Sequence, residues 1–346
     1  MILEQESQLL AQIKEGELSP IYLLYGEEQY LKELYCRKLQ ESAVGDAFPE
    51  FNLHVFDGNK LDMEQVAAAV ESMPFMAEQR CVVISPFNYG TLNNKDKDIF
   101  DSLLDSPVPT TVLILIVNDP EFLPKKNAKA KKLIAHVDHV GVVMELNKRS
   151  ESDMAKFLQK KAKDCGCSIS KDLCQYLLER CEDDMLTLSN EVDKICAYAG
   201  SGEITKEQID AVTVKAVSAR IYDLAKAILA EQSELAMSIV QELIYLRYQP
   251  TVILSSLSSA YLDLYIAKAA LADGKGQAEI AKNFEYRGRD FVIRNSLRDC
   301  RKYSTEVLRR SVAYLAQTDL RMKSSRADSN ILLEQCVAQL LMIVRG

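Results

Sequence analysis

The chain has 346 residues, a formal net charge of −8, 48% hydrophobic residues and 27% charged residues, which is the ordinary composition of a soluble protein with more than one domain. No run reaches the roughly 18 apolar residues that a membrane-spanning helix needs, and the acidic, amphipathic N-terminus is unlike a signal peptide. The 9 cysteines are irregularly spaced, which argues against a secreted disulfide framework. We therefore expect a cytoplasmic protein with no membrane partner.

Apolar, strand-like runs alternate with helix-period segments along the first 147 residues. The strand-like runs lie at 21–25, 52–56, 81–85, 112–117 and 142–146, and the helical patterns lie near 27–44, 61–72, 95–106 and 128–137. This alternation predicts a series of βαβ units with a parallel sheet. The run VLILIV has no polar alternation, which is typical of a strand covered on both faces. We predict an α/β domain over residues 1–147.

The segment 21–33, IYLLYGEEQYLKE, begins like a phosphate-binding loop but lacks the groups that hold phosphate. Gly26 follows an apolar strand, and Lys32 stands where the lysine of the GxxxxGK[ST] motif belongs. However, Leu31 replaces the second glycine, and Glu33 replaces the hydroxyl that binds Mg²⁺. We predict a degenerate, non-functional phosphate loop and no bound cofactor.

The groups that nucleotide hydrolysis requires are also missing elsewhere. Glu27 and Glu28 favour a helix N-terminus but repel a phosphate there. Ser85 and Pro86 follow the strand CVVI, where two acidic residues would bind Mg²⁺ and activate water. Asn118 stands where related ATPases sense the γ-phosphate, but an Asn-Asp-Pro turn explains it as well, and we favour the turn. No catalytic residue is expected in this chain.

Everything after residue 148 has helical periodicity. Ser150 and Ser170 are placed to cap helices, and Thr205 begins a capping box. These signals predict a small helical lid domain over residues 148–212. Long amphipathic patterns continue over residues 213–346 and predict a helical collar or oligomerisation domain.

A basic segment lies within this acidic chain. Residues 275–326 hold 13 Lys and Arg against 6 Asp and Glu, a net charge of +7 that leaves −15 for the remainder. Two interpretations are open: the segment contacts DNA phosphates, or its charges lie on the solvated and partner-facing sides of helices. We slightly favour the second, because few aromatic residues interleave with the basic ones. The shorter run PKKNAKAKKL is better explained as a solvated helix start.

Four cysteines lie close together in the predicted lid: Cys165, Cys167, Cys174 and Cys181. Four thiolates can bind zinc or an iron–sulfur cluster, but their spacing lacks paired CxxC motifs. Cys174 and Cys181 are seven positions apart, which places them on one helix face. We therefore favour ordinary core packing and expect no metal.

Several motifs together resemble one protein family. YLLYGEEQYLKE, NLHVFDG, VESMPFMAEQRCVVI, NEVDKICAYAG and AQTDLRMKSS occur in the order seen in the delta subunits of bacterial DNA polymerase III, the clamp-loader subunits that open the sliding clamp. The resemblance implies an AAA+-like domain without ATPase activity, a helical lid and a collar. The collar would join ATPase subunits and a delta-prime-like subunit in a five-membered ring that acts on primed DNA. Nucleotidyl transfer would belong to the whole polymerase, since this chain has no recognisable two-metal carboxylate site.

In that family a pair of large apolar residues after a helix engages the sliding clamp, and the matching residues here are Ser72, Met73, Pro74, Phe75 and Met76. Pro74 prevents simple continuation of the helix, and adjacent Phe75 and Met76 cannot both face inward. Large apolar side chains in a connection suit a partner-binding site. The alternative is that they fill the core of their own domain.

Two other functions compete with the clamp-loader interpretation. One is a nucleotide-dependent AAA+ enzyme that uses Lys32 in an atypical loop. The other is a DNA-binding structural protein that acts through residues 275–326.

Overall fold

The structure, a computed structural model, describes residues 1–3, 6–181, 184–284, 286 and 290–346, and divides into two compact units, Met1–Lys148 and Arg149–Gly346. Arg287 and Arg289 of the basic segment lie outside the described residues. None of the helices in the described ranges is long and apolar enough to span a bilayer.

The first unit is built on a parallel sheet, which has six strands in the described residues, in the order β1-β6-β2-β5-β4-β3. The strands are β1 (Ile2–Leu3), β2 (Ile21–Tyr25), β3 (Leu53–Asp57), β4 (Arg80–Ser85), β5 (Thr111–Ile116) and β6 (Val142–Glu145). The five predicted runs coincide with β2 to β6 to within one residue at each end. Strand β1, which pairs with β6, was not predicted, because two residues carry no readable periodicity.

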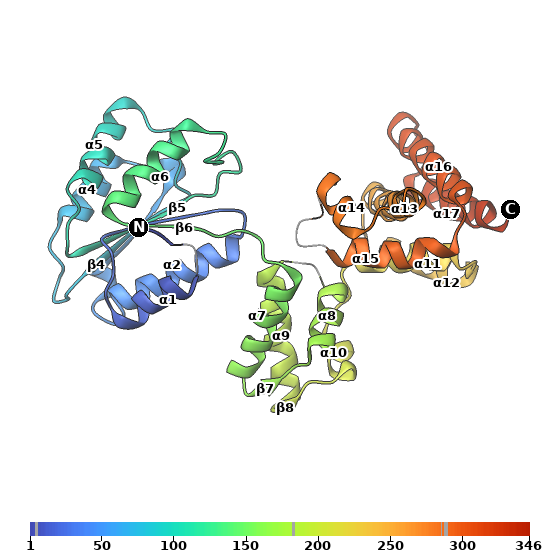
Figure 1. Cartoon of the computed structure of the whole chain (residues 1–346), viewed down its shortest axis with the longest axis horizontal. Coiled ribbons are helices and arrows are strands. Elements are labelled where there is room, and N and C mark those ends of the chain that lie inside the picture. The colour runs from blue at the N-terminus through green and yellow to red at the C-terminus, as the bar shows by residue number, and fades with distance from the viewer. Residues whose placement is uncertain (4–5, 182–183, 285, 287–289) are drawn as a thin grey trace. The chain divides into compact units, whose positions relative to one another are not determined.

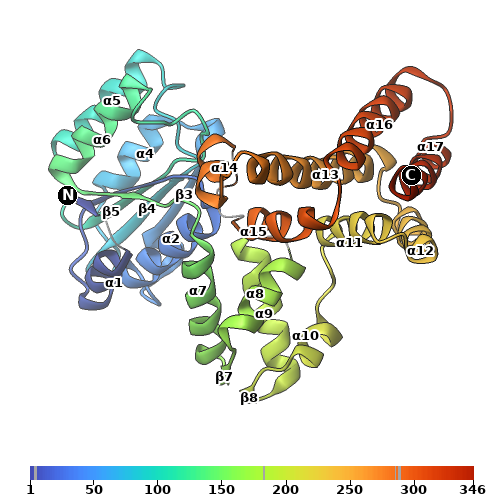
Figure 2. The ribbon, with the colours of Figure 1, turned by 45° about the vertical axis from the view of Figure 1, so that its right-hand side comes forward.

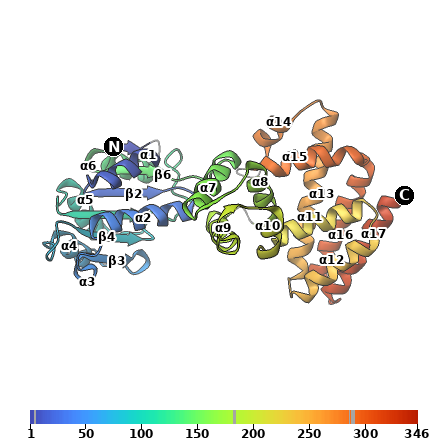
Figure 3. The same ribbon diagram turned by 90° about the horizontal axis from the view of Figure 1, so that it is seen from below.

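Helices cover both faces of this sheet (Figure 1). One face carries α4 (Met63–Glu71), α5 (Asn94–Asp105) and α6 (Ala128–Val140), and the other carries α1 (Glu6–Glu15) and α2 (Gln29–Ala43). Every residue of β2 and β5 is buried, as expected for central parallel strands. The short helix α3 (Pro49–Asn52) lies beside the edge strand β3 (Figure 3).

The chain changes direction across the sheet at β2 and β5, which are neighbours. From β2 the chain continues to β3 at one edge, whereas from β5 it continues to β6 on the other side of β2. In open α/β sheets, ligands bind in the crevice at the carboxyl ends of two such strands. In this crevice, Lys32 of the degenerate loop segment contacts the end of β5 at Val117.

The second unit begins with four helices: α7 (Glu151–Asp164), α8 (Lys171–Arg180), α9 (Met185–Ala199) and α10 (Lys206–Val212). The predicted caps are confirmed, because Ser150 and Ser170 accept backbone N–H bonds at helix starts and Thr205 forms a capping box with Gln208. The expectation that no strand follows residue 148 was wrong. Strands β7 (Cys167–Ser168) and β8 (Gly202–Glu203) form a parallel pair too short to leave a pattern in the sequence.

The remaining helices of this unit are α11 (Val217–Leu229), α12 (Ser233–Tyr245), α13 (Pro250–Ala272), α14 (Gln277–Asn283), α15 (Asp290–Asp299), α16 (Thr305–Ser324) and α17 (Ser329–Arg345) (Figure 2). All of them except α14 contribute to a large apolar core. Helix α13 packs against α11, α15 and α16, and α17 buries most of its apolar side chains among its neighbours. The division of this unit into a lid and a collar at residue 212 remains a prediction.

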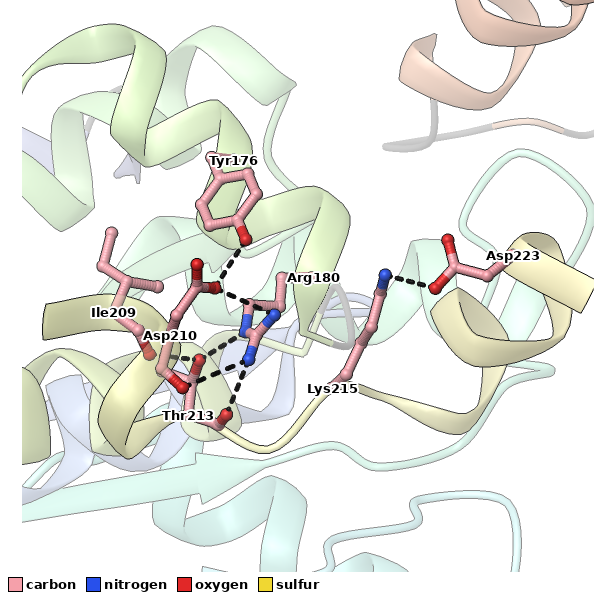
Figure 4. A network of polar contacts seen from close by, with 7 residues as sticks. All are labelled: Tyr176, Arg180, Ile209, Asp210, Thr213, Lys215 and Asp223. Carbon is pink, nitrogen blue, oxygen red and sulfur yellow. Dashed lines mark hydrogen bonds and ion pairs between the residues drawn. The ribbon is translucent and has the colours of Figure 1, made fainter. Parts of the chain in front are cut away.

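A polar network joins α8 and α10 to the segment that leads into α11 (Figure 4). Arg180 donates from Nε to Thr213 Oγ1 at 2.6 Å and from Nη2 to the Thr213 carbonyl at 3.1 Å, and its Nη1 lies 3.0 Å from Asp210 Oδ1. Tyr176 donates to the same carboxylate at 2.6 Å. The Arg180 carbonyl accepts from Ala216 N at 2.9 Å, so one residue holds both ends of this connection.

Candidate functional site: a filled phosphate crevice and an exposed apolar surface

Position 26 requires a glycine because the backbone of Leu146 approaches it closely. The φ of Gly26 is +116°, and a Cβ atom there would lie 2.3 Å from the Leu146 carbonyl oxygen. The same carbonyl accepts a hydrogen bond from Glu28 N at 2.9 Å. The glycine therefore has a structural explanation that involves no phosphate.

Lys32 lies in the crevice between β2 and β5 and is only 3% exposed. Its Nζ donates to the Gly26 carbonyl and to the Val117 carbonyl, each at 2.9 Å. Burial lowers the pKa of Lys32, while the nearby carboxylates of Glu28 and Glu33 act in the opposite direction. The ammonium group thus bridges the carboxyl ends of two strands, and its contacts face inward.

The N-terminus of α2 is occupied by the carboxylate of Glu28. Glu28 is buried and is the N-cap residue, and its side chain accepts a hydrogen bond from Tyr30 N at 3.2 Å. Leu31 is buried in the core, and Glu33 is exposed and accepts a hydrogen bond from Gln29 at 2.7 Å. A phosphate would have to displace the Glu28 carboxylate from the helix N-terminus. These contacts argue against the competing interpretation of a nucleotide-dependent enzyme that uses Lys32. That this loop does not bind phosphate remains a prediction.

Asn118 is exposed at the end of β5, directly before a turn. Phe122 N donates to the Asp119 carbonyl at 3.0 Å, and Glu121 N donates to the Asp119 side chain at 2.8 Å. These two bonds support the turn interpretation of the Asn-Asp-Pro sequence.

The loop between α4 and β4 exposes large apolar side chains. The exposed fractions are 81% for Met73, 48% for Phe75 and 75% for Met76. Helix α4 ends at Glu71, and Ser72 is its C-cap. The alternative that these side chains fill the core of their own domain was therefore wrong.

Two further aromatic residues, which were not predicted, extend this surface. The ring centroid of Phe75 lies 4.9 Å from that of Phe51 and 5.7 Å from that of Phe48. Phe48 and Phe51, at the start of α3 and within it, are themselves 41% and 51% exposed. We call Phe48, Phe51, Met73, Phe75 and Met76 the α3–loop surface. A contiguous apolar surface of this kind is typical of a binding site, with aromatic and methionine anchors.

Cys174 and Cys181 of the second unit pack into its core, as predicted. Cys174 and Cys181 are buried beside Leu177 and Leu178, and burial raises the pKa of each thiol to about 11. Cys165 is exposed and donates to Asp193 at 3.7 Å. Within the described ranges, no group of three or more His, Cys, Asp or Glu residues is arranged to hold a metal ion.

Part of the basic segment is neutralised by carboxylates of its own chain. Five of its described side chains form ion pairs, which are Lys275–Asp273, Arg294–Glu151, Arg298–Asp299, Arg309–Glu306 and Lys323–Asp319. These pairs reduce the charge available to DNA phosphates. Both interpretations of the segment stay open.

Comparisons with known proteins agree with this architecture. Residues 22–145 match the family described as DNA polymerase III, delta subunit, residues 218–340 match the C-terminal domain of the same subunit, and residues 150–211 match a middle-domain family. The chain is 26% identical to the DNA polymerase III subunit delta of Bacillus subtilis over 95% of both chains. It is 22% identical to that of Escherichia coli over 95% of this chain and 93% of the other.

A solved structure gives the same result. The chain superimposes on the Bacillus subtilis DNA clamp loader delta protein with a TM-score of 0.64 and 25% identity, covering 97% of this chain and 99% of that one.

The parallel sheet with helices on both faces, the filled crevice and the mainly helical second unit define the class: an α/β parallel-sheet domain followed by a mainly α-helical part, as predicted. The family matches and the full-length relatives then identify the chain within this class. It belongs to the delta-subunit family of DNA polymerase III.

Proposed function

We propose that this chain is the clamp-loader subunit that binds the ring-shaped sliding clamp and stabilises its open form, using the loop Ser72–Met76 as the main contact. The observation that carries the proposal is the exposure of Met73, Phe75 and Met76 on an α/β domain whose phosphate crevice is filled. Pro74 and Ser72 belong to the same loop and shape its backbone. Phe48 and Phe51 would widen the contact.

The exposed area of two side chains indicates how much binding energy is available. If a Phe or Met side chain offers about 200 Å², the exposed parts of Phe75 and Met76 amount to about 250 Å². At about 25 cal/mol per Å², complete coverage would contribute about 6 kcal/mol. Association and ordering consume much of this, so the rest of the α3–loop surface must also contribute to tight binding.

Clamp opening then follows from binding alone. A protein that binds the open clamp more tightly than the closed one shifts the clamp toward the open state by that difference in free energy. This step needs no nucleotide hydrolysis in the chain itself. The contacts of Lys32 with two backbone carbonyls are consistent with a subunit that does not use ATP.

The ATPase activity would reside in neighbouring clamp-loader subunits. We propose that the helices of residues 213–346 join these subunits and a delta-prime-like subunit. ATP binding by those subunits would make the α3–loop surface available, and primed DNA would be reached through the assembled complex. If ATP binding by the neighbouring subunits increases the affinity for the clamp, clamp binding must increase their affinity for ATP by the same factor.

The test is the affinity of the isolated chain for its cognate sliding clamp, measured by surface plasmon resonance. Full coverage of the two side chains contributes about 6 kcal/mol, but alanine keeps each Cβ atom and avoids the entropy cost of ordering a long side chain, so for Phe75→Ala/Met76→Ala we expect a loss of about 3 kcal/mol, or about 100-fold in affinity. Leu123→Ala/Met342→Ala is the matched control, because Leu123 and Met342 are 45% and 57% exposed elsewhere. Clamp binding equal to wild type by a folded Phe75→Ala/Met76→Ala variant would refute the assignment.

A further inference from the structure

The exposed loop after α4 has few hydrogen bonds of its own. Within the part of the chain that the structure describes, the main chain from Met73 to Glu78 forms hydrogen bonds at Phe75, and these go to one side chain, that of Asn52. A loop with so few internal bonds would be expected to sample many conformations. Its conformation therefore depends on that contact.

Asn52 holds both polar groups of the Phe75 backbone. Phe75 N donates to Asn52 Oδ1 at 2.8 Å, and Asn52 Nδ2 donates to the Phe75 carbonyl at 2.9 Å and to the Ala47 carbonyl at 2.8 Å. The amide orientation is unique, because one N–H needs an acceptor and two carbonyls need donors. The Asn52 side chain thus pairs with Phe75 as a neighbouring strand would.

The segment that provides Asn52 also supports the Phe75 ring. Asn52 is fully buried at the end of α3, and Phe51 beside it contacts the ring. The Phe51 carbonyl in turn accepts a hydrogen bond at 2.9 Å from Arg80, which is 5% exposed at the start of β4. The contact between Asn52 and the loop is therefore anchored to the sheet.

The loop is held in a conformation that it would not adopt freely. Met76 has a φ of +48°, in the left-handed region that side chains other than glycine rarely occupy. Such backbone conformations persist where the surrounding structure determines them, and they cluster at binding sites. The paired bonds at Phe75 fix the residue directly before this position.

We infer that Asn52 is the positioning residue of the clamp-binding loop: it holds Phe75 and Met76 in the binding conformation before the partner arrives. This inference rests on the function proposed above. Preorganisation of this kind increases affinity by reducing the conformational entropy lost on binding. Asn52 is buried and would act through Phe75 without touching the clamp.

The experiment combines clamp affinity with amide hydrogen exchange on the full chain. In Asn52→Ala we expect faster exchange at the Phe75 amide and about a tenfold lower affinity for the clamp. In a Phe75→Ala/Met76→Ala background, Asn52→Ala should lower the affinity less than twofold, because both side chains that Asn52 positions are already absent. If Asn52→Ala does not fold, Asn52→Gln replaces it with the same expected results, since its amide sits one methylene further along.

A control separates positioning from a general loss of stability. Val137→Ala truncates a fully buried residue of α6, so it should lower stability and leave clamp affinity unchanged. Clamp affinity equal to wild type in a folded Asn52 variant, or an equal loss with and without the Phe75 and Met76 side chains, would overturn the inference while leaving the proposed function intact. Failure of the wild-type chain to bind the clamp would overturn both.

Discussion

Replacement of Lys32 by methionine tests whether the crevice between β2 and β5 is filled for structural reasons. The substitution keeps the aliphatic length and removes the ammonium group that donates to the Gly26 and Val117 carbonyls. Each hydrogen bond from a charged donor contributes about 1.5–3 kcal/mol, and the removal of a buried charge offsets part of the loss. We expect the first unit to lose about 2–4 kcal/mol of unfolding free energy.

The pH dependence has a definite sign. The pKa of Lys32 in the folded chain lies below the ordinary value of 10.5, mainly because of burial. Between the folded pKa and 10.5 the unfolded chain binds more protons than the folded one, so stability rises with pH in this window. Below the folded pKa both states are protonated, and the contribution of Lys32 is constant. The stability difference between wild type and Lys32→Met should therefore increase as pH rises toward 10.5.

The assay is urea unfolding of both proteins at several pH values, followed by a signal from the first unit, together with calorimetric titration of ATP. Lys131→Met, which changes an exposed lysine of α6, is the control and should leave stability nearly unchanged. Micromolar ATP binding by wild type that disappears in Lys32→Met, with no change in stability, would refute this account of the crevice. That result would favour the nucleotide-dependent enzyme.

Two further substitutions test other parts of the structure. Gly26→Ala should cost about 2–4 kcal/mol in unfolding experiments, because its Cβ would collide with the Leu146 carbonyl, whereas Gly16→Ala, with a φ of +74° and open space, should cost about 1 kcal/mol. Equal losses of unfolding free energy for the two glycine variants would contradict the close approach of the Leu146 carbonyl to Gly26. Arg180→Met should accelerate amide exchange over residues 213–216, since it removes the bonds to Thr213; unchanged exchange there would show that the network does not hold the connection.

The central strands of the sheet were predictable because they are buried on both faces. Every residue of β5 is buried, so this strand gives a continuous apolar run in the sequence. Its two ends were therefore predicted to within one residue. Helix starts were also readable, since Ser150 and Thr205 cap by local hydrogen bonds. Strands β1, β7 and β8 have two residues each, and their pairing depends on distant segments.

The site was predictable only where local chemistry determines it. Pro74 and the adjacent Phe75 and Met76 identified the exposed loop, with the help of the family resemblance. The contribution of α3 was missed because Asn52 and Phe75 are 23 residues apart, and nothing in either segment indicates that an amide pairs with that backbone. Lys32 occupies the position of a phosphate-binding lysine in a loop that was predicted not to hold phosphate. Its actual partners, the Gly26 and Val117 carbonyls, follow two different strands and appear only in the fold.

The most direct test of the account is whether the isolated chain opens a clamp without ATP. Sliding clamps are first loaded on nicked circular DNA, and their release is followed by gel filtration after the purified chain is added in ATP-free buffer. We expect wild type to accelerate clamp release and Phe75→Ala/Met76→Ala to leave it close to the rate without protein. Release by wild type no faster than that spontaneous rate would contradict the proposal that exposed apolar side chains open the ring.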